Sequence, residues 1–328
     1  MALVGIARLA SQSGLLEAKR AVQYFEIPAR SILNRTKPNM PFQWTINPYR
    51  GCEFGCVYCY ARYTHEFMEL DVHDFEDKIY AKSGAAHLLK QELARVGRTE
   101  HIAIGTATDP YQPAERRYTR TRSILEVFAR ERGRFLSITT KSDLVLRDID
   151  LLKEIARANV LGVNITITTL DEKLARLLEP RAQRPALRLE TVRRLSKAGI
   201  CVAVLPNPIM PGLTDGERQL DRLARAAHDA GALSFGGGPL FLMPSAQKVF
   251  LPFLEKHFPA LAPRYRETYA KSAYLGRDYK EALQQRVRRI RDRYGLASGF
   301  IEYRPELWIE EQLDLWTSPP STTTSPAN

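Results

Sequence analysis

The chain has little cysteine and no long hydrophobic run. Its 328 residues include 4 cysteines, too few and too unevenly spread for the disulfide framework of an extracellular domain. No apolar stretch approaches the ~18 residues that a membrane-spanning helix needs. The first residues have no basic segment ahead of their short apolar stretch, so they do not resemble a signal peptide. These absences predict a cytoplasmic protein that has no membrane partner.

Acidic residues are also scarce relative to basic ones. The chain has 48 lysines and arginines against 37 aspartates and glutamates, which gives a formal net charge of +11. Such an excess favours an anionic partner, and DNA or RNA is the first candidate. The alternative is an arginine-rich surface that faces only solvent. One expected helix, 278–294, carries five arginines.

The hydrophobic pattern divides the chain into four parts. Residues 1–38 are punctuated by proline and are expected to be an irregular or partly helical N-terminal extension. Residues 39–245 form the core, and 246–316 a C-terminal helical region. Residues 317–328 are a low-complexity tail that we expect to be disordered.

In the core, short apolar runs alternate regularly with helical patterns. Strands are expected at 42–47, 101–105, 135–139, 160–168, 201–205, and 233–235 with 240–243. Helices are expected between them at 85–96, 121–132, 143–157, 187–198 and 214–230, and after them at 249–257, 265–274 and 278–294. About six β-α units in series predict an α/β fold with a parallel sheet and right-handed crossovers.

Three of the four cysteines lie within eight residues. Cys52, Cys56 and Cys59 have the spacing C-x3-C-x2-C, while Cys201 is far away in the sequence. Three thiolates on one loop can hold three corners of a [4Fe–4S] cluster, whereas electron-carrying clusters use four cysteines. The remaining iron would have an open coordination position, where chemistry can occur.

A structural zinc site is the alternative for these cysteines. His65 or His73 would then be the fourth ligand. Structural zinc usually draws on two separated ligand pairs. Because no second pair follows here, we favour the cluster.

The cysteine spacing, with an aromatic residue after the middle cysteine, resembles that of the radical S-adenosylmethionine (SAM) superfamily. The resemblance implies a partial (β/α)6 barrel of the TIM type. It also implies two cofactors, a [4Fe–4S] cluster and SAM, and an electron donor of the flavodoxin or ferredoxin type. In that family the open iron binds the amino and carboxylate groups of SAM. One electron then generates a 5′-deoxyadenosyl radical, which abstracts hydrogen from the substrate.

Polar side chains follow the expected strands, at the edge where such barrels carry their chemistry. Lys141 follows the third strand and could neutralise the SAM carboxylate. Thr108, Asp109 and Thr166 follow or end other strands and could supply hydrogen bonds. Taken singly, each of these residues could also be a helix cap or a turn residue.

Within the superfamily, the chain is most similar to the spore photoproduct lyase group, also described as DNA repair photolyase-like. The matching segments are Tyr58-Cys59-Tyr60, Thr108-Asp109 and Thr140-Lys141. In that family the lysine and the Ser/Thr before Asp contact SAM, and the tyrosines flanking the third cysteine are implicated in radical relay. The resemblance therefore implies catalytic roles for Tyr58 and Tyr60, with Tyr58 also beside the cofactor. Packing around cluster and adenine is the alternative for both.

One residue departs from the pattern of that group. Spore photoproduct lyase has a hydrogen-donating cysteine where this chain has Thr106. An O–H bond is far too strong to donate a hydrogen atom as a thiol does, so the thymine-dimer reversal is not expected here. Three functions remain open: a radical SAM enzyme acting on nucleic acid, one acting on a peptide or small metabolite, and a zinc-stabilised nucleic-acid-binding protein.

Overall fold

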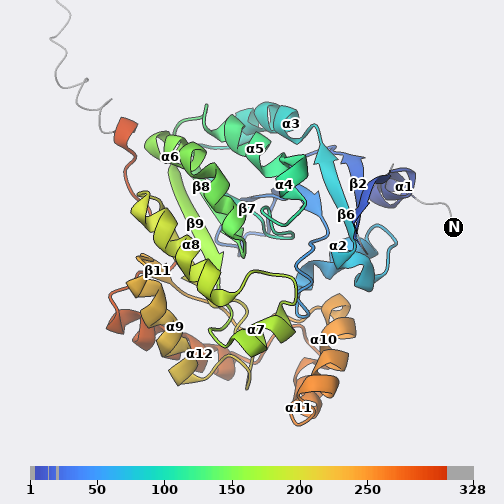
Figure 1. Ribbon diagram of the computed structural model, residues 1–328, viewed down its shortest axis with the longest axis vertical. Coiled ribbons are helices and arrows are strands. Elements are labelled where there is room, and N and C mark those ends of the chain that lie inside the picture. The colour runs from blue at the N-terminus through green and yellow to red at the C-terminus, as the bar shows by residue number, and fades with distance from the viewer. Residues whose placement is uncertain (1–3, 14, 20–21, 309–328) are drawn as a thin grey trace, which may run out of the picture.

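The structure is a computed structural model that describes residues 4–13, 15–19 and 22–308. Its centre is a seven-stranded sheet in the order β11-β10-β9-β8-β7-β4-β3 (Figure 1). Six strands are parallel and adjacent in chain order, and only β3 is antiparallel. They are β3 (Leu33–Arg35), β4 (Trp44–Ile46), β7 (His101–Ile104), β8 (Phe135–Thr140), β9 (Val160–Thr166), β10 (Cys201–Leu205) and β11 (Ser234–Phe235). Since β3 and β11 do not pair, the sheet is an open, partial barrel, and the expected fold class is confirmed.

Helices connect the parallel strands and cover the sheet. They are α3 (Ala85–Glu92), α4 (Glu115–Tyr118), α5 (Arg120–Phe128), α6 (Ile149–Ala158), α7 (Glu172–Leu178), α8 (Pro185–Lys197) and α9 (Glu217–Asp229). A parallel strand covered on both faces is apolar along its length rather than alternating. In β9 only Asn164 is not fully buried, as expected for a strand that is covered on both faces. Leu136, Val163 and Val204 from neighbouring strands are completely buried in this core.

A second, smaller sheet lies beside the barrel. Its order is β1-β2-β6-β5, with β2 and β6 parallel. The strands are β1 (Leu15–Lys19), β2 (Val22–Pro28), β5 (Tyr49–Arg50) and β6 (Lys78–Ser83), and α1 (Gly5–Gln12) lies next to β2 (Figure 1). The expectation that 1–38 would be irregular or partly helical is therefore wrong for β1, β2 and β3. Proline does not interrupt β2, because Pro28 is its last residue.

The end of the barrel also differs from the expected pattern. Residues 240–243 do not form a strand. The Leu240 amide donates to the Ile209 carbonyl, and the Leu242 amide donates to the Ala273 carbonyl. This apolar run is a largely buried loop that joins the barrel to the C-terminal helices. An apolar run was therefore not sufficient to predict a strand here.

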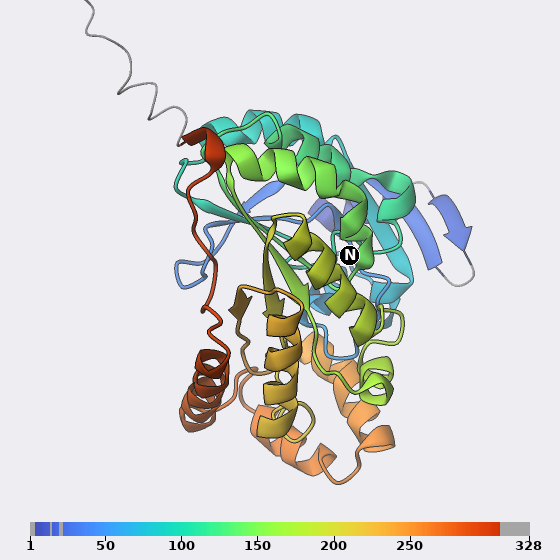
Figure 2. The same cartoon turned by 60° about the vertical axis from the view of Figure 1, so that its left-hand side comes forward.

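Three helices follow the barrel, as expected: α10 (Pro244–His257), α11 (Ala262–Tyr269) and α12 (Arg277–Arg293). Figure 2 shows α12 alongside α9. Arg293 pairs with Asp221 at 2.5 Å, and Arg286 donates to the Asp215 carbonyl at 2.7 Å. Two of the six arginines of α12 therefore attach it to the rest of the protein, Arg293 to α9 and Arg286 to the segment before α9. The expected tail, 317–328, lies outside the described residues. In the described part of the chain, no helix combines the length and the apolar character needed to cross a bilayer.

Candidate active site

The three-cysteine loop begins directly after β5 and is held from several sides. The Cys52 amide donates to the Phe75 carbonyl, and the Val57 amide donates to the Leu178 carbonyl, each at 3.0 Å. Gly51 has φ of +79°, and a Cβ there would lie 2.7 Å from the Lys78 carbonyl oxygen. Only glycine fits this close approach, so the backbone fixes where the loop begins.

The thiols on this loop are largely enclosed. Cys52 and Cys56 are 9% exposed, and Cys59 is half-buried. Burial raises the pKa of all three thiols, for Cys56 to about 12. Lys141 opposes this rise at Cys56 and Cys59, which places its ammonium group near both. Because metal ligands must be thiolates, loading this loop with a metal would release protons.

The donor set fits a three-cysteine cluster better than the zinc site. The Nε2 atom of fully buried His65 lies 3.0 Å from the Lys78 carbonyl oxygen, and its ring packs edge-on against Phe75 and Tyr80. His73 is exposed. Within the described residues, no three His, Cys, Asp or Glu side chains could hold a single metal ion. Three thiols on one loop suit a cluster, in which each cysteine binds a different iron.

Cys201 lies at the amino ends of the parallel strands, whereas the cysteine loop lies at their carboxyl ends. Cys201 is the first residue of β10 and pairs with Gly162 of β9. The cysteine loop instead lies beyond the carboxyl end of β4, which the short strand β5 separates from the loop. The predicted absence of Cys201 from the cluster agrees with this separation.

Tyr58 and Lys141 belong to a buried network that the sequence did not reveal. The Tyr58 hydroxyl donates to Glu179 and lies 3.2 Å from the Thr168 hydroxyl. The Glu179 carboxylate also accepts from Thr168 at 2.6 Å and pairs with Arg188 at 2.5 Å. Lys141 lies 3.9 Å from Glu179 and 5.9 Å from the centre of the Tyr58 ring. We call Tyr58, Lys141, Thr168, Glu179 and Arg188 the closed network.

Glu179 balances the charges of this network. Burial alone would raise the pKa of Glu179, but Arg188, Lys141 and its hydrogen bonds lower it to about 2. Arg188 also donates to the Thr166 carbonyl at 3.0 Å, so it ties the network to the end of β9. Glu179 follows α7, a helix for which the sequence showed no clear pattern, and no local motif marks either Glu179 or Arg188. Glu179 and Arg188 are nine residues apart in the sequence, and only the packing of the folded chain brings their side chains together.

Thr108 and Asp109 organise the edge of the sheet. Thr108 donates from its hydroxyl to the Gly51 carbonyl at 2.6 Å, which connects the end of β7 to the cysteine loop. Asp109 accepts from the Thr140 hydroxyl at 2.6 Å and from the Lys141 amide at 2.7 Å. The predicted site residues on adjacent strands are thus brought together. Their contacts to SAM, and that of Thr166, stay a prediction.

Tyr60 lies on the outer side of the same loop. Its hydroxyl donates to the Thr106 carbonyl, and its side chain is 37% exposed. The Thr106 hydroxyl is half-buried and lies 3.2 Å from Asn47 Nδ2, at the end of β4. Tyr58 is therefore enclosed beside Lys141, whereas Tyr60 is at the surface of the site. Radical relay by either residue stays a prediction.

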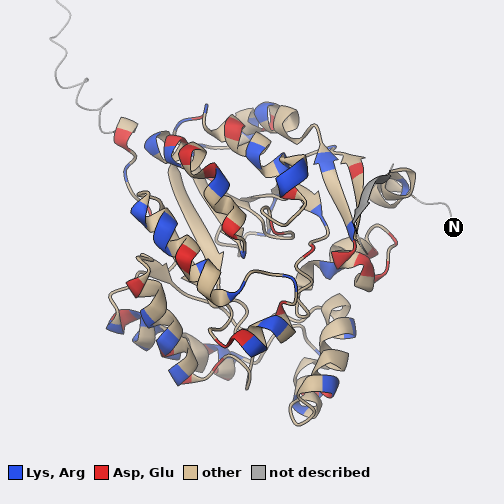
Figure 3. Cartoon of the chain, in the orientation of Figure 1, with Lys and Arg blue, Asp and Glu red and all other residues tan. Residues whose placement is uncertain are grey.

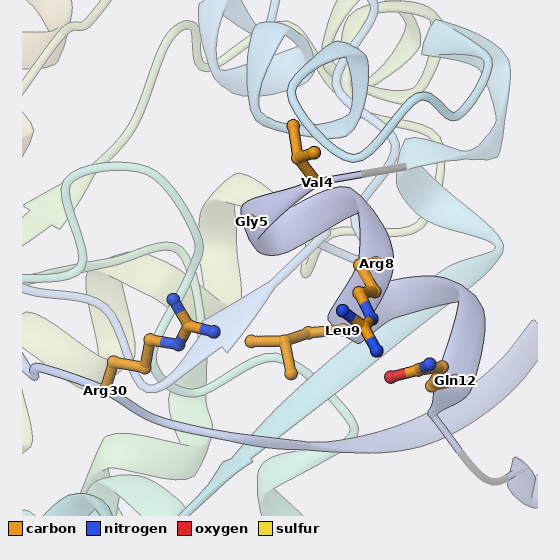
Figure 4. Close-up of a pocket in the computed structure, with 6 residues that line it drawn as sticks. All are labelled: Val4, Gly5, Arg8, Leu9, Gln12 and Arg30. Atoms are coloured by element: carbon orange, nitrogen blue, oxygen red, sulfur yellow. The ribbon is translucent and has the colours of Figure 1, made fainter. Parts of the chain in front are cut away.

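A separate pocket lies away from the cysteine loop. It has a volume of about 310 Å³ and lies against α1 (Figure 4). It is lined by Val4, Gly5, Arg8, Leu9, Gln12 and Arg30. It contains none of the predicted site residues, so it is not the pocket expected for SAM.

The chain belongs to the radical SAM superfamily. The model of that family matches residues 46–240, which contain the cysteine loop, the last residue of β4 and the five parallel strands that follow it. The chain is accordingly a radical SAM enzyme, a class that uses SAM and an iron–sulfur cluster.

Relatives and solved structures extend this similarity over most of the chain. An uncharacterized protein of Mycobacterium tuberculosis is 36% identical over 315 residues, which are 93% of this chain and 91% of that protein. One of Methanocaldococcus jannaschii is 31% identical over 201 residues, covering 60% and 71%. Spore photoproduct lyase complexed with dinucleoside spore photoproduct has a TM-score of 0.64 at 14% identity, covering 91% of this chain and 85% of that one. This likeness shows the shared fold that the tyrosine and lysine motifs implied.

Proposed function

We propose that Cys52, Cys56 and Cys59 hold a [4Fe–4S] cluster whose open iron binds SAM, and that the enzyme abstracts hydrogen from DNA. When bound, the cluster and SAM supply the 5′-deoxyadenosyl radical, with an electron from a flavodoxin- or ferredoxin-type donor. The observation that carries the proposal is the position of Lys141, a cation next to Cys56 and Cys59 at the carboxyl edge of the sheet. A cation there can neutralise the carboxylate of SAM.

The residues around the loop have separate tasks in this proposal. Lys141 binds the SAM carboxylate, while Asp109 fixes the backbone from which Lys141 projects. Glu179 holds the Tyr58 hydroxyl and limits how far the Lys141 ammonium group can move. Thr108 holds the loop against β7. The thiols are largely enclosed, which would keep bulk water from most of the metal site.

Nucleic acid is the substrate class that the charge supports. The net charge is +11, although acidic and basic residues are interspersed along the helices rather than separated (Figure 3). One solved structure with this fold is a spore photoproduct lyase mutant with bound AdoMet and dinucleoside spore photoproduct. Thr106 has no thiol to return a hydrogen atom to a substrate radical, so we propose a reaction other than the reversal of the spore photoproduct.

The cluster assignment is tested by loading the protein under anaerobic conditions. Iron and sulfide should bind to the wild-type protein and to Cys201→Ala, and should be largely lost in Cys56→Ala. Retention of the cluster in Cys56→Ala, or equal loss in Cys201→Ala, would refute the ligand assignment.

The substrate is tested by isotope transfer. Reduced enzyme, SAM and carbon-deuterated DNA should give 5′-deoxyadenosine that contains deuterium. Formation of 5′-deoxyadenosine without deuterium from DNA, but with deuterium from a peptide or metabolite pool, would show that DNA is not the substrate. Clean conversion of spore-photoproduct DNA to thymines would refute the argument from Thr106.

A further inference from the structure

Five aromatic side chains form a continuous strip beside the cysteine loop. Phe67 packs edge-on against Tyr63 at 5.3 Å between ring centres, and Tyr63 is nearly parallel to Tyr60 at 6.4 Å. Tyr60 contacts Phe241 at 6.0 Å, and Phe241 contacts Tyr274 at 4.6 Å. We call these five residues the aromatic strip. It connects α2 (Tyr63–Glu66), the cysteine loop, the end of the barrel and the segment before α12.

The strip is at the surface, unlike the aromatic residues of the core. Phe67 is 63% exposed, Tyr274 58% and Tyr60 37%. They are among the few large hydrophobic side chains of the described residues that are exposed to this degree. Tyr60 follows Cys59 directly and is hydrogen-bonded to the end of β7. The strip therefore borders the candidate active site, and contiguous apolar surface of this kind marks a binding region.

Two cations follow from the strip: Arg50 interacts with Tyr63 of the strip, and Lys82 interacts with Arg50. Arg50 and Lys82 have no hydrogen bond or ion pair from their side chains to any of the described residues. Arg50 of β5 is opposite Tyr80 of β6. Lys82 is two residues after Tyr80, so its side chain points to the same face of the small sheet as those of Tyr80 and Arg50. Arg50 is close enough to Tyr63 and Lys82 to interact electrostatically with both. We call Arg50 and Lys82 the cation pair.

The cation pair is costly unless an anion binds to it. Lys82 is 9% exposed and Arg50 is half-buried, so both charges have lost hydration and repel each other. Burial, and then Arg50, lower the pKa of Lys82 to about 7. A bound anion would restore the charged form of Lys82. A third cation, Lys280, lies 4.9 Å from the centre of the Tyr274 ring at the far end of the strip.

We propose that the aromatic strip and the cation pair bind an unpaired stretch of DNA, with bases on the exposed rings and a phosphate at Arg50 and Lys82. This inference rests on the proposed function, because it names the form of DNA that reaches the site. Aromatic faces combined with positive charge are the features that bind single strands. In a duplex the bases are stacked on each other and cannot cover these rings.

Charge favours DNA over an apolar peptide as the occupant. Glu66 of α2 is an acidic residue next to the strip in the sequence, and it is paired with Lys248 at 2.8 Å. Among the described residues the cation pair has no ion pair within 4 Å, and Glu92 compensates Lys82 only in part. A phosphate supplies the missing negative charge, and the adjacent base supplies a flat surface for the rings.

The test measures binding of cluster-loaded protein to a fluorescent 15-nucleotide single strand and to the same sequence as a duplex. Phe67→Ala and Tyr274→Ala change exposed side chains outside the candidate catalytic groups. Each should weaken single-strand binding by roughly tenfold or more and change duplex binding much less. Arg50→Ala should lower the slope of log binding constant against log salt concentration by about 1, the change expected for the loss of one phosphate contact. Leu233→Ala is the matched control, since Leu233 is 47% exposed and lies just before the amino end of β11, whereas Phe241 of the strip follows the carboxyl end of that strand.

Each outcome decides between the alternatives. If Phe67→Ala and Tyr274→Ala bind the single strand like the wild type, while DNA still transfers deuterium to 5′-deoxyadenosine, the strip is not the binding surface and the proposed function stands. Equal losses on single strand and duplex would overturn recognition of unpaired bases. At least tenfold tighter binding of single-stranded RNA would overturn the assignment to DNA. If the wild type binds no nucleic acid in any form, the DNA substrate itself is wrong.

Discussion

Two groups of buried charged side chains lie near the cysteine loop and differ in how their charges are balanced. In the closed network, Glu179 is surrounded by Arg188, Lys141 and two hydroxyl groups. In the cation pair, Arg50 and Lys82 face each other with no acidic partner within hydrogen-bond distance among the described residues. The first arrangement is complete in the protein alone and positions side chains. The second is completed by something that binds.

This difference predicts opposite responses to removing a charge. Taking one member from a compensated buried pair leaves an isolated charge, which is strongly destabilising. Taking one member from an uncompensated pair removes a desolvation cost. The predictions below test this contrast, from the largest expected effect to the smallest.

Glu179→Gln should destabilise the folded protein most. Arg188 would lose its only ion-pair partner among the described residues while staying buried. A loss of about 3–5 kcal/mol in the free energy of unfolding is expected, measured by urea denaturation. Glu172→Gln on the exposed face of the preceding α7 is the control and should change little. Equal stability of the two variants would show that the closed network is not a stabilising unit.

Lys141→Ala should act mainly on SAM binding. A charge-assisted hydrogen bond from this ammonium group to the SAM carboxylate contributes about 1.5–3 kcal/mol, so SAM affinity should fall by roughly ten- to a hundredfold. Equilibrium titration of the cluster-loaded protein measures this. Lys153→Ala, an exposed lysine on α6, is the control. Unchanged affinity in Lys141→Ala would remove this residue from the SAM site.

Lys82→Met should raise the stability of the DNA-free protein, by about 1 kcal/mol or more, because it removes a buried cation that faces Arg50. The same change should weaken DNA binding. Thermal unfolding with and without DNA measures both effects. A loss of stability in the DNA-free protein would indicate that Lys82 has a stabilising partner and would weaken the contrast with Glu179.

The smallest effect is a dependence on pH. Burial and Arg50 lower the pKa of Lys82 from 10.5 to about 7, and Glu92 of α3 partly opposes this. Between pH 7 and 10.5 the unfolded chain then binds more protons at this residue, so its contribution makes folding more favourable as pH rises. The stability difference between wild type and Lys82→Met should therefore shrink from pH 7 to pH 10. A constant difference over this range would contradict the lowered pKa.

The sequence predicted the features that depend on short stretches of chain. The spacing of Cys52, Cys56 and Cys59 lies within eight residues. The apolar runs of β8, β9 and β10 are local patterns as well, and β10 has the bounds that were expected. The α7 helix and strand β6 were missed, because β6 is stabilised by pairing with β2 and β5 rather than by its own pattern.

Only the tertiary structure decided which side chains surround the cysteine loop. Tyr58 and Glu179 are 121 residues apart in the sequence, and Tyr60 meets Phe241 from the other end of the barrel. Neither pair has a sequence signature, since each residue alone is an ordinary tyrosine, glutamate or phenylalanine. A metal-binding motif needs several ligands of one type close together and is therefore readable from the sequence. A buried ion pair or an aromatic contact needs only two residues at the right distance, and the fold alone sets that distance.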